Sequence, residues 1–164
     1  MKGLVGVPIT LALVLIGVRE IDMVPEAMKQ LTHGFLKVLE ECKTEMNLSE
    51  GVITDLYHLW REEYDQISRD AGCVIHCMSK KLQLFGDDGK IHHENIKEFA
   101  VKNGAEEKVA AQLLSLAHEC EKKQEGIEDE CERTLEVAKC FRRDVKQIDW
   151  VPKMEVLMTE VIEA

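Results

Sequence analysis

Apolar residues recur at three- and four-residue intervals from Pro25 onward, which is the spacing of amphipathic α-helices. Proline suits the first position of a helix, so we expect a first helix from Pro25 to about Asn47. We expect Ser49 to cap the second helix. The apolar stripes of these helices are Met28, Leu31, Phe35, Leu39 and Cys42 in the first and Val52, Ile53, Leu56, Leu59, Trp60, Tyr64 and Ile67 in the second.

A central helix is expected next, from about Asp70 to Leu84, and the turn-rich segment 85–89 stops it. That segment is not a calcium loop of the EF-hand type. Aligning Gly89 with the invariant EF-hand glycine places Leu84, which has no oxygen in its side chain, at the first ligand position.

Three further helices complete the predicted fold. A short one from about His93 to Lys102 ends at Asn103-Gly104, a typical helix stop. Two longer ones flank a polar link at residues 122–129, and Pro152 ends the last. Their apolar faces are Val109, Leu113, Leu116, Ala117 and Cys120 in one and Cys131, Leu135, Ala138, Phe141, Val145 and Ile148 in the other. The sequence therefore predicts an all-α domain.

The two ends of the chain have different patterns. Lys2, an apolar run at residues 4–18 and a polar stretch at residues 19–22 have the layout of a secretory signal peptide, which we assign to residues 1–23. The mature domain is then 24–164. At the other end, residues 153–164 form an amphipathic tail that needs an apolar surface to cover its apolar face, which consists of Met154, Leu157, Met158 and Val161.

Composition narrows the possible partners. The 164 residues are enough for one domain with one sizeable core, and 45% hydrophobic but only 5% aromatic residues indicate a core of aliphatic side chains. The formal net charge is −10. A nucleic-acid or anionic-membrane partner requires concentrated Lys and Arg, so we expect neither.

Six cysteines can form three disulfides in a secreted protein, with fifteen arithmetically possible pairings. Cys73 and Cys77 lie on one face of the central helix, one turn apart, and are too distant to bridge each other without distorting it. Each is therefore expected to tie the central helix to a different neighbour. No Cys-x2-Cys pair is present, so we expect no zinc or other metal, and no cofactor.

The cysteine spacing x30, x3, x42, x10, x8 resembles that of the insect odorant-binding proteins, whose hallmarks are the x3 and x8 intervals. The surrounding segments are more specific and are similar to the moth pheromone-binding branch from Val24 to the end of the chain. They are FxKxLEEC at 35–42, LWREEY at 59–64, GC at 72–73, KIHH at 90–93, NGA at 103–105, HECEK at 118–122 and WVP at 150–152.

This resemblance implies six helices around an apolar cavity, held by the disulfides Cys42–Cys77, Cys73–Cys131 and Cys120–Cys140. It also implies a secreted carrier in sensillar lymph that brings long-chain alcohols, aldehydes or acetates to olfactory receptors. The candidate partners are a small hydrophobic ligand, a receptor or other neuron membrane protein, and a second copy of the chain. No enzymatic activity and no nucleic acid are expected.

The family pattern implies a set of ligand-binding residues. Ser79 is the hydroxyl that fixes the ligand head group, and it lies one turn after Ile75 on the face opposite the sulfurs. Leu59 departs from the aromatic residue that the family often has there, so ligand preference cannot be transferred. The remaining expected wall residues are Met28, Phe35, Trp60, Phe99, Leu114, Val137 and Phe141.

A pH switch is the second expectation. His92, His93 and His118 would charge and repel one another below roughly pH 6 and loosen the loop that they hold. Burying Glu155 or Glu160 of the tail in the cavity becomes easier in acid, because burial favours the protonated carboxyl. We expect acid to drive the tail in and the ligand out. The alternative is three structural histidines.

Three other functions are consistent with parts of the sequence. A general odorant carrier for plant volatiles cannot be separated from a pheromone carrier by the residues. A secreted lipid hydrolase is weakly suggested by His76 between two cysteines, but Gly-x-Ser-x-Gly and His-Glu-x-x-His motifs are missing. A membrane-active protein of the saposin kind would be shorter and would have a different cysteine spacing.

Overall fold

The computed structural model describes residues 26–148, with side chains described from residue 35 onward. These residues form six α-helices and two short 3-10 helices, and within them there is no strand beyond an isolated bridge between Phe85 and Ile91. The all-α prediction is therefore confirmed. The helices are α1 (Glu26–Glu45), α2 (Gly51–Arg61), α3 (Arg69–Lys81), α4 (His93–Lys102), α5 (Glu107–Lys123) and α6 (Glu130–Asp144), with the 3-10 helices η1 (Tyr64–Gln66) and η2 (Val145–Gln147).

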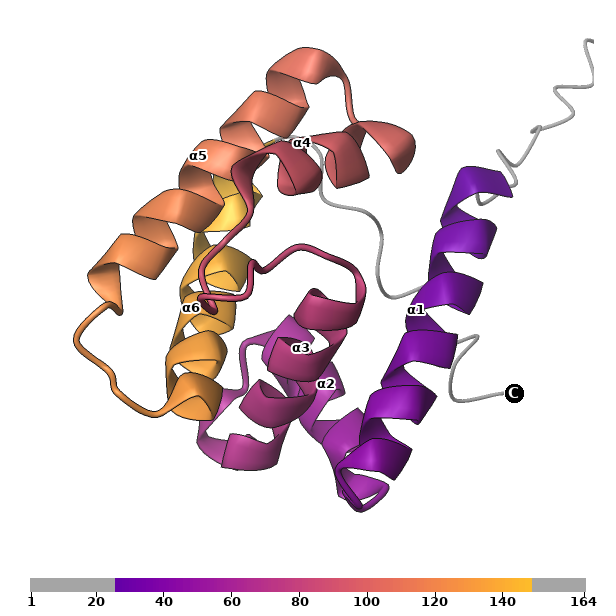
Figure 1. Ribbon diagram of the computed structural model, residues 1–164, viewed down its shortest axis with the longest axis vertical. Coiled ribbons are helices and arrows are strands. Elements are labelled where there is room, and N and C mark those ends of the chain that lie inside the picture. Colours follow the sequence, from indigo (N-terminus) through magenta and orange to yellow (C-terminus); the bar gives the residue numbers. More distant parts are fainter. Residues whose placement is uncertain (1–25, 149–164) are drawn as a thin grey trace, which may run out of the picture.

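Helix α3 lies at the centre of the fold. It contacts α1, α2 and α6, while α4 and α6 both pack against α5. Figure 1 shows α5 and α6 on one side of α3 and α1 on the other. No helix within residues 26–148 is long and apolar enough to cross a membrane.

Disulfides fix this arrangement. Cys42–Cys77 joins α1 to α3, Cys73–Cys131 joins α3 to α6, and Cys120–Cys140 joins α5 to α6. These are the three pairs that the family resemblance implies. Helix α3 is thus tied to both α1 and α6, as expected from the one-turn spacing of its two cysteines.

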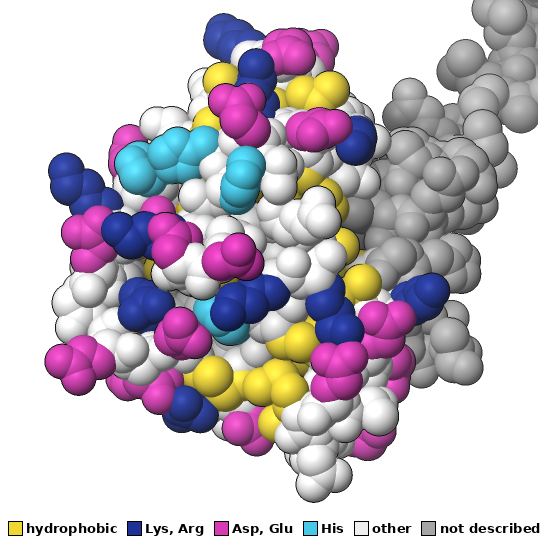
Figure 2. Space-filling model, viewed as in Figure 1, with side chains coloured by type: hydrophobic (Ala, Val, Ile, Leu, Met, Phe, Trp, Pro, Cys, Tyr) yellow, Lys and Arg dark blue, Asp and Glu magenta, His cyan; other side chains and the backbone are white. Residues whose placement is uncertain are grey.

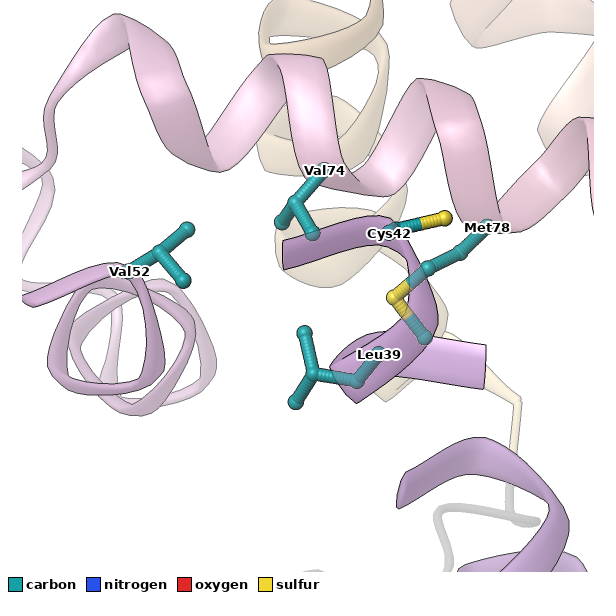
Figure 3. Packing of buried hydrophobic residues seen from close by; sticks show 5 residues of the cluster. All are labelled: Leu39, Cys42, Val52, Val74 and Met78. Atoms are coloured by element: carbon teal, nitrogen blue, oxygen red, sulfur yellow. The ribbon is translucent and has the colours of Figure 1, made fainter. Parts of the chain in front are cut away.

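The core has two parts. One lies between α1, α2 and α3, where the side chains of Leu39, Cys42, Val52, Val74 and Met78 form one buried cluster (Figure 3). The other lies between α4, α5 and η2 and is built mostly from small side chains, namely Ala100, Ala105, Ala110, Leu113 and Val145. Small residues let these elements approach closely but fill little space.

Helices α3 and α6 approach each other closely at Gly72. A Cβ atom at this position would overlap the backbone carbonyl oxygen of Cys131. Glycine is therefore required here for close approach, next to the Cys73–Cys131 disulfide.

The first helix ends close to Asn47, as predicted, but the next two helices end earlier than predicted. Asn47, Glu62 and Gln83 have φ angles of 51°, 64° and 57°, and each stops a helix in the left-handed region. The second helix therefore ends at Arg61 and does not reach Ile67, and the central helix ends at Lys81 and not at Leu84.

Two further sequence predictions need correction. Ser49 does not cap α2: the capping position is Glu50, whose side chain makes no capping hydrogen bond. The last predicted helix is also shorter as an α-helix, because it ends at Asp144 and continues as η2.

Candidate functional site

A pocket of about 310 Å³ lies between α3, α4, α5, α6 and the segment that connects α3 to α4. This volume falls within the range of small-molecule sites. Its wall is almost entirely apolar and consists of Ile75, Ser79, Leu84, Phe85, Ile91, Ile96, Phe99, Ala100, Asn103, Leu113, Ala117, Thr134, Val137, Ala138 and Phe141.

The wall follows from helical spacing. Helix α4 contributes positions 96, 99 and 100 and its C-cap position 103, and α6 contributes positions 134, 137, 138 and 141. Both sets have the i, i+3, i+4, i+7 pattern of one helix face. Helices α3 and α5 each add a pair four residues apart, at 75 and 79 and at 113 and 117. Four helix faces therefore surround the pocket.

The connection between α3 and α4 closes one side of the pocket. After the left-handed Gln83, the Leu84 backbone N–H donates to the Ser79 carbonyl oxygen at 2.8 Å, which reverses the chain direction. A tight turn at Gly86–Gly89 follows, and the Phe85–Ile91 bridge closes it. Three apolar residues of this connection line the pocket, namely Leu84, Phe85 and Ile91.

Five of the ligand-binding residues expected from the sequence line this pocket: Ile75, Ser79, Phe99, Val137 and Phe141. The structure thus brings together residues from α3, α4 and α6 that are up to 66 positions apart, from 75 to 141.

The other expected residues lie elsewhere. Leu59 is buried, and the Trp60 ring is half-buried beneath the Arg142 guanidinium, 4.6 Å from the ring centroid. Phe35 is 37% exposed. Leu114 is half-buried, and its neighbour Leu113 is the one that lines the pocket. Met28 is in α1, but its side chain lies outside the described residues.

Sequence reasoning missed ten wall residues. Several of them lie three or four positions from a residue that was identified, as Ile96 and Asn103 do from Phe99, Thr134 from Val137 and Ala138 from Phe141. Extending each identified position by three or four residues would have found these. The segment 84–91 had no such signal, because its path depends on the left-handed Gln83.

Three wall residues carry polar groups: Ser79, Asn103 and Thr134. The Asn103 side-chain amide donates to the Phe99 carbonyl oxygen at 2.7 Å and so helps to end α4. The Thr134 hydroxyl lies 3.1 Å from Nδ1 of the buried His76. A ligand in this pocket therefore meets few polar contacts.

The predicted switch histidines come together beside the pocket elements. His92 is the N-cap of α4, and its Nδ1 accepts a hydrogen bond from the Asn95 backbone N–H at 3.4 Å. The rings of His93 and His118 lie edge to face with centroids 4.6 Å apart. Figure 2 shows histidine side chains gathered in the upper part of the molecule, where α4 and α5 lie in Figure 1. The tail residues Glu155 and Glu160 lie outside the described residues.

One cluster of potential metal-ligating atoms occurs in the part of the chain that is described, at Cys120, Cys140 and Asp144. Both sulfurs belong to a disulfide and so provide no thiolate. This cluster is therefore no candidate metal centre.

Comparison with known proteins identifies the family. A sequence model of the PBP/GOBP family matches residues 25–144. Pheromone-binding protein 2 of Epiphyas postvittana is 36% identical over 137 residues, which cover 84% of this chain and 83% of that protein. General odorant-binding protein 2 of Antheraea pernyi is 39% identical over 137 residues, with 84% of each chain covered.

A solved structure agrees with these sequence matches. The crystal structure of Epiphyas postvittana Pheromone Binding Protein 3 superposes with a TM-score of 0.69 at 53% sequence identity, covering 71% of this chain and 99% of that one. Together with the three disulfides and the helical pocket, these matches establish that the chain belongs to the PBP/GOBP family.

Proposed function

We propose that this protein is an extracellular carrier that binds long-chain hydrophobic odorants or pheromones and delivers them to olfactory receptors. The observation that supports this most strongly is the pocket of about 310 Å³, whose wall is apolar apart from three residues. Such a wall favours an aliphatic chain, and Ser79 offers a hydroxyl to its head group. The related proteins include both pheromone-binding and general odorant-binding proteins, so both ligand classes remain in the proposal.

The expected residues outside this pocket remain part of the proposal. Met28, Phe35, Leu59, Trp60 and Leu114 come from α1, α2 and α5, and we infer that they contact the part of a long ligand that extends beyond the described wall.

Secretion follows from the signal peptide proposed for residues 1–23. Candidate partners beyond the ligand are a receptor or another membrane protein of the neuron and a second copy of the chain.

Acid-triggered release is the proposed control. Protonation of His92 at Nδ1 removes the acceptor for the Asn95 N–H and adds positive charge at the N-terminus of α4, where the helix dipole opposes it. Protonation of both His93 and His118 adds repulsion between rings 4.6 Å apart. Both effects weaken the contact between α4 and the rest of the pocket wall. Tail carboxyls at Glu155 and Glu160 would favour insertion under the same conditions.

Displacement of the fluorescent probe N-phenyl-1-naphthylamine by aliphatic alcohols, aldehydes and acetates at pH 7 tests the carrier function. Ala138 lines the pocket on α6, so Ala138→Phe should fill it and weaken binding of C16 ligands at least about tenfold. Ala111→Phe on the exposed face of α5 is the matched control and should bind like the unmodified protein. Equal affinities of both variants would argue against this pocket as the binding site.

The same samples distinguish a carrier from the lipid hydrolase. A carrier returns the acetate esters intact after incubation. Hydrolysis that is lost on replacing His76 would support the enzyme.

A further inference from the structure

His76 is a buried histidine behind the pocket wall. Its side chain extends from α3 toward α6, and the residue is only 9% exposed. Nδ1 lies 3.1 Å from the hydroxyl oxygen of Thr134, which lines the pocket, and the ring packs edge to face on Phe85, another wall residue. The other ring nitrogen, Nε2, is buried and has no hydrogen-bond partner among the described residues.

The surroundings of Nε2 determine which nitrogen holds the proton. Burial lowers the pKa of His76, so the ring is neutral at pH 7 and has one N–H. The Glu130 carboxylate lies 3.6 Å from Nε2, beyond hydrogen-bond distance but close enough to favour a proton on that nitrogen. Nδ1 is then a hydrogen-bond acceptor.

The direction of the bond to Thr134 follows from this. An unprotonated Nδ1 can only accept, so the Thr134 hydroxyl donates its single hydrogen to it. The Thr134 oxygen is left with lone pairs and with no hydrogen for a ligand. Thr134 lines the pocket, and a ligand group that reaches its oxygen meets a hydrogen-bond acceptor and no donor.

We propose that Thr134, oriented by His76, is a specificity-determining residue that makes the pocket select ligands with a hydroxyl group over aldehydes and acetates of equal chain length. A long-chain alcohol can donate its hydrogen to the Thr134 oxygen. An aldehyde or acetate has only acceptor oxygens, which the Thr134 lone pairs oppose. This inference rests on the proposed carrier function and assigns the head-group class that the pocket takes.

The other hydroxyl in the pocket wall, that of Ser79, is not restricted in the way that His76 restricts Thr134. Ser79 also lines the pocket from α3, one turn after Ile75, and its hydroxyl can rotate to donate or accept. Ser79 therefore holds either type of head group, whereas Thr134 discriminates between them.

Competition binding with hexadecan-1-ol, hexadecanal and hexadecyl acetate against N-phenyl-1-naphthylamine tests the inference. The unmodified full chain should bind the alcohol about fivefold more tightly than the other two ligands, the worth of one neutral hydrogen bond. Thr134→Val keeps the side-chain shape and removes the oxygen, so it should abolish this ratio. Thr134→Ser keeps the hydroxyl and should retain it.

The role of His76 as a positioning residue is tested through the same ratio. His76→Leu removes the acceptor and frees the Thr134 hydroxyl to donate, so the alcohol preference should be lost. His76→Asn places an acceptor oxygen near the Nδ1 position and should restore it in part.

The pH dependence of the ratio is a readout that a purely structural role would not change. The charged groups facing His76 are Glu130 and Arg133 of α6 and Lys80 of α3. When acid protonates the ring, Nδ1 becomes a donor and Thr134 can donate to a ligand carbonyl. The affinity ratio of alcohol to aldehyde or acetate should therefore decrease in acid for the unmodified chain. For His76→Leu, which has no alcohol preference, this ratio should not change with pH.

The outcomes separate the two proposals. If none of the three ligands displaces the probe, the carrier function is wrong. If all three bind with equal affinity, or if Thr134→Val keeps the fivefold ratio, the carrier function stands and the inference is wrong. Unchanged probe affinity and helical circular dichroism in each variant show that the pocket is intact.

Discussion

At the scale of single residues, His76 connects stability to pH. Its Nδ1 is hydrogen-bonded to the Thr134 hydroxyl, and the Phe85 ring packs against the imidazole. A positive charge on this buried ring is therefore poorly solvated. This is the cause of its lowered pKa, with Glu130 acting in the opposite sense. A buried neutral histidine is stable at neutral pH and becomes unfavourable in acid.

The sign of the effect can be predicted. The unfolded chain takes up a proton at His76 near the ordinary value of 6.5, whereas the folded chain does so only at lower pH. Between these two pKa values the unfolded state binds more protons, so the free energy of unfolding falls as pH drops below 6.5. The loss is at most about 1.4 kcal/mol for each pH unit between them.

Urea unfolding at pH 7.5 and pH 5 checks the predicted fall in the free energy of unfolding. In His76→Leu the decrease in unfolding free energy between these pH values should be smaller than in the unmodified chain. His58 forms a half-buried hydrogen bond with Glu63 and is the control position, because His58→Leu leaves the His76 imidazole in place. An equal decrease in the unmodified chain and in His76→Leu would contradict the assignment.

At the scale of elements, the apolar period identified all six helices, but it placed the ends of α2, α3 and α6 too late. The residues that stop α1, α2 and α3 are asparagine, glutamate and glutamine in the left-handed region. Glycine is the usual signal for such a stop, as Gly104 is after α4, where the prediction agreed. At Glu62 and Gln83, where no glycine stands, the apolar pattern continued and gave no reason to end α2 and α3.

The strained stop after α3 gives a stability prediction. Gln83 is exposed and has a φ of 57°, so Gln83→Gly should relieve backbone strain and raise the free energy of unfolding by about 1 kcal/mol. Its carbonyl group, which accepts from the Asn95 side chain, is retained. Thermal unfolding measures the change.

Gly104 provides the reciprocal control. It has a φ of 91° with open space around it, so Gly104→Ala should be destabilising through backbone strain alone. If Gln83→Gly lowered stability, the left-handed stop would not be a source of strain.

At the scale of the whole molecule, the disulfides hold helices around a pocket that is not filled by side chains. An unfilled pocket loses dispersion contacts, which the cross-links offset by restricting the unfolded chain. The closed loops differ in length, with sequence separations of 35, 58 and 20 residues.

Removing the bridges one at a time should reflect these lengths. Each Cys-to-Ala pair should lower the free energy of unfolding by about 2–4 kcal/mol. Loss of Cys73–Cys131 should cost about 1 kcal/mol more than loss of Cys120–Cys140, because its loop is longer. Chemical denaturation of the three double variants gives the order, and the reverse order would show that packing at α3 and α6 outweighs chain entropy.

The tail prediction also belongs to the whole molecule. A chain that ends at Ile148 should hold its ligand to a lower pH than the full chain, because no segment is left to enter the pocket in acid. Probe fluorescence along a pH titration measures the release. Release at the same pH from both chains would contradict a role for the tail.

The sequence by itself determined the helical class, the six elements and, through the family resemblance, the three disulfides, because helical period and cysteine spacing are local properties of the chain. The same resemblance indicated five wall residues, among them Ser79 and Phe141. Only the tertiary structure decided which helix faces share the pocket, how segment 84–91 covers it, and that His76 meets Thr134 across 58 positions. These features depend on how closely the helices approach and on where the chain reverses, as at Gly72 and Gln83, and neither has a periodic signal.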